Sequence, residues 1–105
     1  MSTEDKIRKQ LAENPVLLYM KGTPDDPKCG FSRNAVEALK QLGARYAYIN
    51  VLEAPFIREK LPSVSNWPTY PQLFVKGELV GGSDVIVAMV EDGSLKPMLA
   101  AAGGV

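Results

Sequence analysis

The chain has 105 residues, the length of one small domain with a single core, and we expect one domain over residues 1–105. Its 12 lysines and arginines balance 12 aspartates and glutamates, which excludes the strongly basic surface typical of nucleic-acid-binding proteins. No apolar run is long enough to span a bilayer, and the N-terminus resembles neither a secretory signal nor a transit peptide. We therefore expect a cytoplasmic protein without a nucleic-acid or membrane partner.

One cysteine and no histidine narrow the possible chemistry. A single cysteine excludes an intramolecular disulfide and any metal site built from several cysteines of one chain. The absence of histidine removes the commonest zinc ligand and the commonest general base. Many enzyme classes are therefore excluded before any motif is considered.

The first element predicted is a short helix over residues 3–13. Ser2 followed by Asp5 predicts a capping box at its start, and Asn14-Pro15 ends it. The continuous apolar run Val16–Met20 then predicts a buried central strand, because a strand covered on both faces does not alternate apolar and polar residues.

A βαβ unit is expected next. Residues 21–28 are rich in glycine and proline and predict a loop. Helical spacing starts at Phe31, taken as the first core residue of the helix, and continues to Leu42, with Gly43 as the stop signal. Residues 46–51 predict a second strand, which should run parallel to the first through a right-handed crossover.

The second half predicts an antiparallel hairpin between helices. The expected elements are a helix opened by Pro55, strands over 73–75 and 79–80, a helix over 83–91 capped by Ser83, a last helical segment from Gly93, and a frayed tail over 100–105. A parallel pair joined to an antiparallel hairpin makes the expected fold an α/β one, with a mixed four-stranded sheet flanked by helices.

Cys29 is the first candidate for chemistry. A free cysteine without context is more often a small buried apolar residue. Cys29, however, precedes a predicted helix, where unpaired N–H groups and the helix dipole stabilise a thiolate, and Lys21 and Lys28 add positive charge nearby. Such settings lower a thiol pKa from its usual value of about 8.5. The resulting thiolate is both a nucleophile and a metal ligand.

The sequence Cys29-Gly30-Phe31-Ser32 resembles the CGFS motif of monothiol glutaredoxins. Three more segments resemble this family in order and spacing, namely Met20–Pro24, Asn66–Leu73 and Gly77–Asp84. The resemblance runs from about Asn14 to Leu95 and is strongest to the single-domain bacterial members. It implies a thioredoxin-like fold and glutathione as a ligand.

The resemblance also implies a glutathione site made of Lys21, Cys29, Phe31, Arg58, Tyr70, Pro71, Ser83 and Asp84. In the family, glutathione's cysteine faces the active-site sulfur and its glycine carboxylate meets basic side chains, here Lys21 and Arg58. The backbone of Tyr70 would pair with the tripeptide like an added strand. Ser83 and Asp84 would hold the γ-glutamyl group.

Taken one by one, these residues have simpler explanations. Lys21 and Arg58 are typical of solvated surfaces, Trp67 of a core, and Asp84 of a favourable first helical turn. Their joint placement favours the functional interpretation, and the resemblance implies a cis bond before Pro71. Many relatives carry a cysteine where this chain has Ser83, so no mechanism with a second thiol at that position applies.

The resemblance further implies a [2Fe-2S] cluster. Such a cluster needs about four thiolate-type ligands, and this chain supplies only Cys29. Two chains and two glutathiones complete the set, so the cluster-bound form is expected to be a symmetric homodimer. The implied role is cluster delivery to apo iron–sulfur proteins or iron-status signalling, with BolA-like proteins as further partners.

Two other functions compete with this one. Cys29 could attack the mixed disulfide of a glutathionylated protein, with free glutathione resolving the intermediate. Ser32 stands where dithiol relatives have a resolving cysteine, and the long loop Thr23–Lys28 is expected to place the glutathione sulfur poorly, so at most weak oxidoreductase turnover is expected. A third possibility, an adaptor domain without cofactor, leaves the glutathione-contact residues unexplained.

Overall fold

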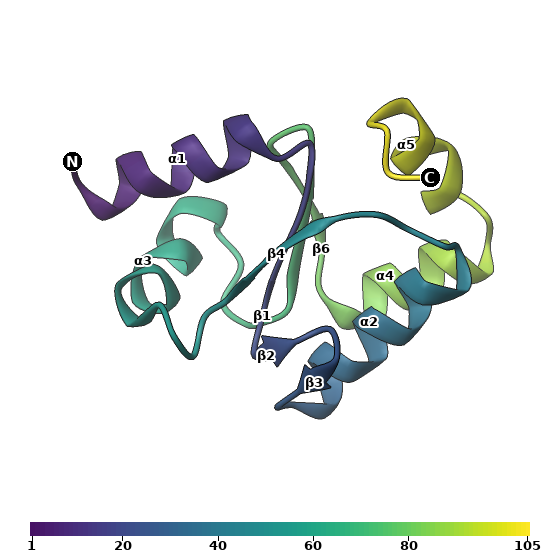
Figure 1. The fold of residues 1–105 in the computed structure, drawn as a ribbon, viewed down its shortest axis with the longest axis horizontal. Helices are drawn as coiled ribbons and strands as arrows, with labels where there is room; N and C mark the ends of the chain where they lie inside the picture. The colour runs from purple at the N-terminus through teal and green to yellow at the C-terminus, as the bar shows by residue number, and fades with distance from the viewer.

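A computed structural model describes residues 1–105 as a central sheet with helices on both faces (Figure 1). Helices α1 and α3 lie on one side of the sheet, and α2, α4 and α5 lie on the other. The helices are α1 (Thr3–Glu13), α2 (Gly30–Gln41), α3 (Pro55–Ser65), α4 (Ser83–Glu91) and α5 (Leu95–Ala101). The strands are β1 (Val16–Met20), β2 (Gly22–Thr23), β3 (Asp26–Pro27), β4 (Ala47–Asn50), β5 (Gln72–Val75) and β6 (Glu78–Gly81).

The main sheet has the strand order β4-β1-β5-β6. Strand β1 pairs in parallel with β4 and antiparallel with β5, and β5 pairs antiparallel with β6. The expected mixed four-stranded sheet flanked by helices is therefore confirmed. None of the helices combines the length and the apolar character needed to cross a membrane.

Strand β1 is buried along its whole length because both of its faces pack against helices. Leu18 and Met20 belong to a core with residues of α2, α4 and α5. Leu17 and Tyr19 belong to a second core with residues of α1 and α3, where the Tyr19 hydroxyl donates to Gln10 Oε1 at 2.8 Å. This two-sided burial explains why the sequence of β1 is apolar throughout.

The predicted helix ends are confirmed where local side chains define them. Ser2 and Asp5 form the expected capping box of α1, which ends at Glu13 before Asn14. Gly43 follows the C-cap of α2 with a φ of 64°, and Pro55 occupies the first position of α3. In each case the decisive contact lies within one helical turn, so the sequence alone is sufficient.

Two predictions about loops are wrong. Residues 21–28 are not an irregular loop but contain the β2–β3 hairpin, in which Gly22 pairs with Pro27. The tail over 100–105 is not frayed: its first two residues end α5, and Gly104 is buried and accepts a hydrogen bond from Arg45 N–H at 2.7 Å. The tail is ordered by a residue distant in sequence, whereas the hairpin is formed by local backbone pairing.

Candidate functional site

A cleft of about 760 Å³ lies where the loop after β1 meets the N-terminal ends of α2 and α4, flanked by α3 and residues 67–70. Seven of the eight predicted site residues line it: Lys21, Cys29, Phe31, Arg58, Tyr70, Ser83 and Asp84. Pro71 follows directly after the lining residues. A cleft of this size is typical of sites for small ligands.

Cys29 is the N-cap residue of α2, as predicted, with an extended backbone (φ −149°, ψ 141°) and a partly exposed thiol. Partial burial raises the pKa of this thiol, but the N–H groups of Ser32 and Phe31, the Ser32 hydroxyl and the charge of Lys21 together lower it below its usual value. The Cys29 side chain forms no capping hydrogen bond with the N–H groups of α2, so these groups act on the sulfur from beyond ordinary hydrogen-bond length.

Ser32 connects the start of α2 to the end of β1. It is completely buried, and its Oγ accepts a hydrogen bond from the Lys21 N–H at 3.1 Å. Because that contact uses only a lone pair of Oγ, the hydroxyl proton remains free to point toward Cys29. Sequence reasoning saw only the missing second cysteine at this position and not the role of the hydroxyl.

Phe31 corrects the sequence prediction. It is not the first core residue of α2, because its side chain is 62% exposed at the rim of the cleft. The buried stripe of α2 begins one residue later, at Ser32, and continues through Ala35, Val36 and Leu39. An exposed phenylalanine beside a reactive thiol provides an apolar contact for a ligand or a partner chain.

Two cations face the cleft without a carboxylate partner. Neither Lys21 nor Arg58 takes part in a salt bridge, whereas Lys28 is paired with Asp26 at 2.7 Å. Of the two lysines expected to act on Cys29, only Lys21 therefore contributes to its pKa. Unpaired cations in a cleft attract a carboxylate ligand.

Tyr70 presents unpaired backbone polar groups at the cleft. The Tyr70-Pro71 bond is cis, as expected, and neither the N–H nor the C=O of Tyr70 takes part in a backbone hydrogen bond. Its side chain is fixed because the hydroxyl donates to the Arg58 C=O at 2.8 Å. Burial raises the pKa of this hydroxyl to about 12, although the positive charge of Arg58 acts to lower it. The free backbone groups are those that an added strand would use.

The N-terminus of α4 closes the other side of the cleft. Ser83 does not cap this helix as predicted, since the N-cap residue is Gly82 and Ser83 is the first helical residue. The first hydrogen bond of the helix runs from Ile86 N–H to Gly82 C=O at 3.0 Å, so the N–H groups of Ser83 and Asp84 have no partner within the helix. They are available to an anionic group.

Sequence reasoning missed several residues that line the cleft, namely Pro62, Trp67, Pro68, Thr69, Gly82 and Val85. Trp67, for which a core position was only the simpler alternative, lies against Gly82: a Cβ on Gly82 would meet its Nε1 at 3.1 Å and the Pro71 C=O at 3.3 Å. The available signal was the proline-rich run 66–71, of which residues 67–70 line the cleft.

The family model named Glutaredoxin matches residues 16–80, a range that includes Cys29 and the Tyr70-Pro71 pair. The chain belongs to the glutaredoxin family. It is 54% identical over 100 residues to Glutaredoxin 4 of Pasteurella multocida, covering 95% of this chain and 92% of that protein. It is 53% identical over 98 residues to Glutaredoxin 4 of Escherichia coli K12, covering 93% and 85%.

Solved glutaredoxin structures share the fold of this chain. Reduced apo GrxS14 from poplar superposes with a TM-score of 0.81 at 38% identity, covering 97% of this chain and 94% of that one. A buckwheat glutaredoxin–glutathione complex superposes with a TM-score of 0.82 at 27% identity, covering 98% and 94%. The thioredoxin-like fold expected from the motifs is thereby confirmed.

This glutaredoxin has one thiol with which to act. No group of three or more histidine, cysteine, aspartate or glutamate side chains lies close enough together to hold a metal ion. Cys29 supplies a single soft ligand, at the mouth of a cleft with free cations and free N–H groups. Any iron–sulfur centre here needs ligands from outside the chain.

Proposed function

We propose that this protein binds a [2Fe-2S] cluster through Cys29 and glutathione, and that it delivers the cluster to apo iron–sulfur proteins. The observation that carries the proposal is the single thiol of lowered pKa at the mouth of a cleft whose polar groups match a tripeptide. The cluster is cargo, because one chain holds it by one bond only.

Glutathione fits the chemistry of the cleft from end to end. Lys21 and Arg58 would bind its glycine carboxylate, and the free N–H and C=O of Tyr70 would pair with its central residue. The N-terminus of α4, with Ser83, would receive the γ-glutamyl carboxylate, and Asp84 its ammonium group. The buckwheat glutaredoxin–glutathione complex supports glutathione as the ligand.

The ligand count makes the cluster-bound form a homodimer. Two Cys29 thiolates and two glutathione thiolates supply the four ligands that a [2Fe-2S] cluster needs. Phe31 is exposed beside each thiol and would contribute an apolar contact across the two-fold axis. A BolA-like protein would replace one protomer, and cytoplasmic apo-proteins would receive the cluster.

Anaerobic reconstitution with iron, sulfide and glutathione tests this proposal. The native chain should give a brown dimer with about one [2Fe-2S] cluster per two chains, measured by visible spectroscopy, iron analysis and light scattering. Cys29→Ser should lose the cluster, and leaving out glutathione should strongly reduce its yield. A full cluster on the Cys29→Ser chain would disprove the proposal.

A second function, glutathione-dependent disulfide exchange, is favoured by the same lowered pKa. The Cys29 thiolate would attack the glutathione sulfur of a mixed disulfide, forming a Cys29–glutathione disulfide and releasing the protein thiolate. A glutathione thiolate would then release oxidised glutathione and restore Cys29. No second cysteine is available to resolve the intermediate internally.

Comparing the two activities on the same preparation decides between them. We expect efficient cluster transfer to an apo-ferredoxin and slow turnover in a glutathione-coupled reductase assay, relative to a dithiol glutaredoxin. Rapid reductase turnover without detectable transfer would reverse the order. Because both activities use Cys29, a misfolded or oxidised sample would lack both and cannot be mistaken for either result.

A further inference from the structure

Lys21 is a cleft cation whose backbone is held at both of its polar groups. Its N–H donates to Ser32 Oγ at 3.1 Å, and its C=O accepts from Lys28 N–H at 3.0 Å. Both polar backbone groups of this residue are therefore fixed, one by Ser32 in α2 and one by Lys28, which lies between β3 and Cys29. These contacts hold the Lys21 backbone on two sides, and the peptide that follows Lys21 is held by a third, separate contact.

The residue after it, Gly22, is fixed by a side chain from β4, the edge strand that pairs with β1. Gly22 N–H donates to Asn50 Oδ1 at 2.9 Å, and the same oxygen accepts from Leu52 N–H at 3.0 Å. Asn50 is the last residue of β4 and does not line the cleft. One amide oxygen thus joins the turn after β1 to the turn after β4.

Gly22 cannot be anchored by packing instead. Its φ is +90°, and a Cβ there would lie 2.5 Å from the Asp26 C=O and 2.6 Å from the Lys28 N. No other residue type fits, so the position carries no side chain of its own. The hydrogen bond that links Gly22 to the main sheet is donated by its N–H and accepted by Asn50 Oδ1.

We propose that Asn50 is a positioning residue for glutathione binding, which holds Lys21 in its cleft-facing orientation by fixing the following peptide. This inference rests on the proposed function, since it assigns Lys21 to the ligand's carboxylate. Asn50 acts at a distance: it touches the backbone of Gly22, and that backbone carries Lys21. Its short side chain reaches two N–H groups at once because an amide oxygen has two lone pairs.

The first measurement concerns the segment itself. Amide hydrogen exchange and ¹⁵N relaxation should show Gly22 and the β2–β3 hairpin protected in the native chain and mobile in Asn50→Ala. Asn50→Asp keeps an acceptor oxygen and should restore protection. Asn14→Ala is the matched control, because it also removes a side-chain-to-backbone hydrogen bond, from Asn14 Nδ2 to Gln10 C=O, but at the opposite end of β1.

The second measurement is a double-mutant cycle on glutathione affinity. Asn50→Ala should weaken binding roughly threefold to tenfold. This loss is smaller than that expected from removing the charge-assisted contact of Lys21 altogether, because the lysine is still present. In a Lys21→Ala background, the same change should have almost no further effect, because the side chain that it positions is gone. Asn50→Asp should recover most of the affinity, and Asn14→Ala should leave it unchanged.

The outcomes separate this inference from the proposed function. Equal losses from Asn50→Ala in the two backgrounds, or an unchanged Gly22 amide in Asn50→Ala, would overturn the positioning role. If the native chain fails to bind glutathione, the proposed function fails, while the exchange data still decide whether Asn50 fixes the Lys21 segment. If loss of any such hydrogen bond weakened binding by destabilising the whole fold, Asn50→Ala would lower the affinity in both backgrounds, and Asn14→Ala would lower it as well.

Discussion

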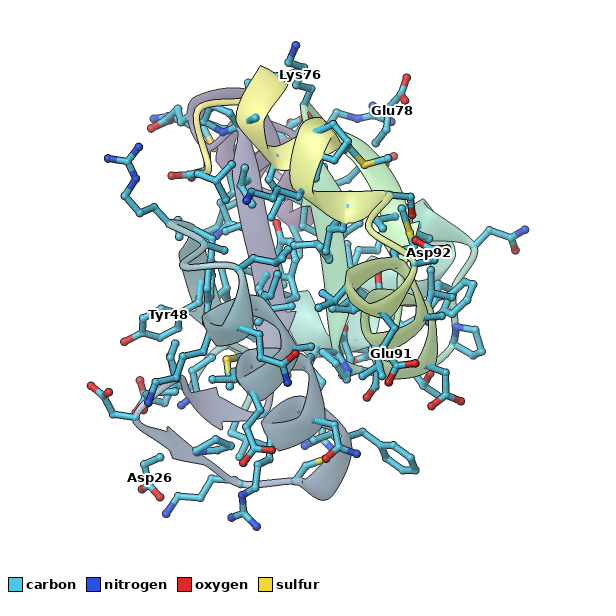
Figure 2. All side chains as sticks on the ribbon, turned by 90° about the vertical axis from the view of Figure 1, so that its right-hand side faces the viewer. Asp26, Tyr48, Lys76, Glu78, Glu91 and Asp92 are labelled. Atoms are coloured by element: carbon cyan, nitrogen blue, oxygen red, sulfur yellow. The ribbon has the colours of Figure 1, made fainter.

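The two ends of the central sheet carry tight turns that are built differently. At the cleft end, the turn after β1 is tied to α2 and β4 through Ser32 and Asn50. At the other end, the Lys76-Gly77 turn between β5 and β6 is open to solvent and makes one backbone bond outside the hairpin, from Lys76 N–H to Pro15 C=O at 2.7 Å. Figure 2 shows Asp26 near the first turn, opposite Lys76 and Glu78.

Several polar groups without a protein partner surround the thiol at the cleft end. The cleft end keeps two cations without carboxylates, the free backbone of Tyr70 and the open N-terminus of α4. Near the far end, the C-terminal tail is paired: Gly104 C=O accepts a hydrogen bond from Arg45 N–H. Because unmet polar groups cost free energy, their concentration around one thiol indicates where a ligand binds.

Alanine at the two turn glycines gives the largest expected contrast in stability. Gly22→Ala should lower the free energy of unfolding by roughly 2–5 kcal/mol, because positive φ costs about 1–2 kcal/mol and backbone overlap a further 1–3 kcal/mol. Gly77 has a φ of +79° but nothing within 4 Å of an added Cβ, so Gly77→Ala should cost only the roughly 1–2 kcal/mol of strain.

Urea unfolding of the two variants beside the native chain measures this difference. Equal losses would mean that the cleft-end turn relaxes around the methyl group and is not held as rigidly as its hydrogen bonds indicate. A larger loss at Gly77 would contradict the comparison directly.

Removing one cation from each end gives the next largest effect. Arg58→Ala should weaken glutathione binding by about 1.5–3 kcal/mol, roughly tenfold to a hundredfold, because it removes a charge-assisted contact to the ligand's carboxylate. Lys76→Ala removes the same charge at the far end and should leave the affinity unchanged. Calorimetric titration measures both, and equal weakening would mean that net charge alone attracts the ligand.

The parts of this structure that the sequence predicts well depend on short-range patterns. The capping box at Ser2 and the stop at Gly43 each involve a single turn, and the apolar run of β1 follows from burial on both faces. The position of Cys29 at the start of α2 follows from the glycine- and proline-rich segment before it. These features require no knowledge of distant residues.

The failures occur where a distant partner decides or where an element is too short to show a pattern. At the start of α2, Phe31 and Ser32 fit the helical spacing equally well, and Ser32 is buried because the Lys21 N–H satisfies its hydroxyl. The β2–β3 hairpin has strands of two residues, too short for a hydrophobic period. Gly104 is buried because the tail docks against Arg45, a contact with no local signature.

The smallest expected effect concerns the thiol itself and the pH dependence of stability. The pKa of Cys29 is lower in the folded chain than in the unfolded chain, so between those two values the unfolded chain binds more protons. The stabilisation is therefore complete above the unfolded pKa of about 8.5 and is lost as the pH falls through the folded pKa. Partial exposure of the thiol keeps this contribution small.

Subtracting a variant without the thiol isolates that contribution. The free energy of unfolding of the native chain minus that of Cys29→Ser should rise with pH up to about 8.5 and then level off, under reducing conditions. Alkylation of native Cys29 should show its inflection below that pH, and the urea-unfolded chain should shift it back, since unfolding disperses Lys21 and the N–H groups of α2. A difference that falls with rising pH would mean that burial outweighs these groups and that the cleft end does not favour a thiolate.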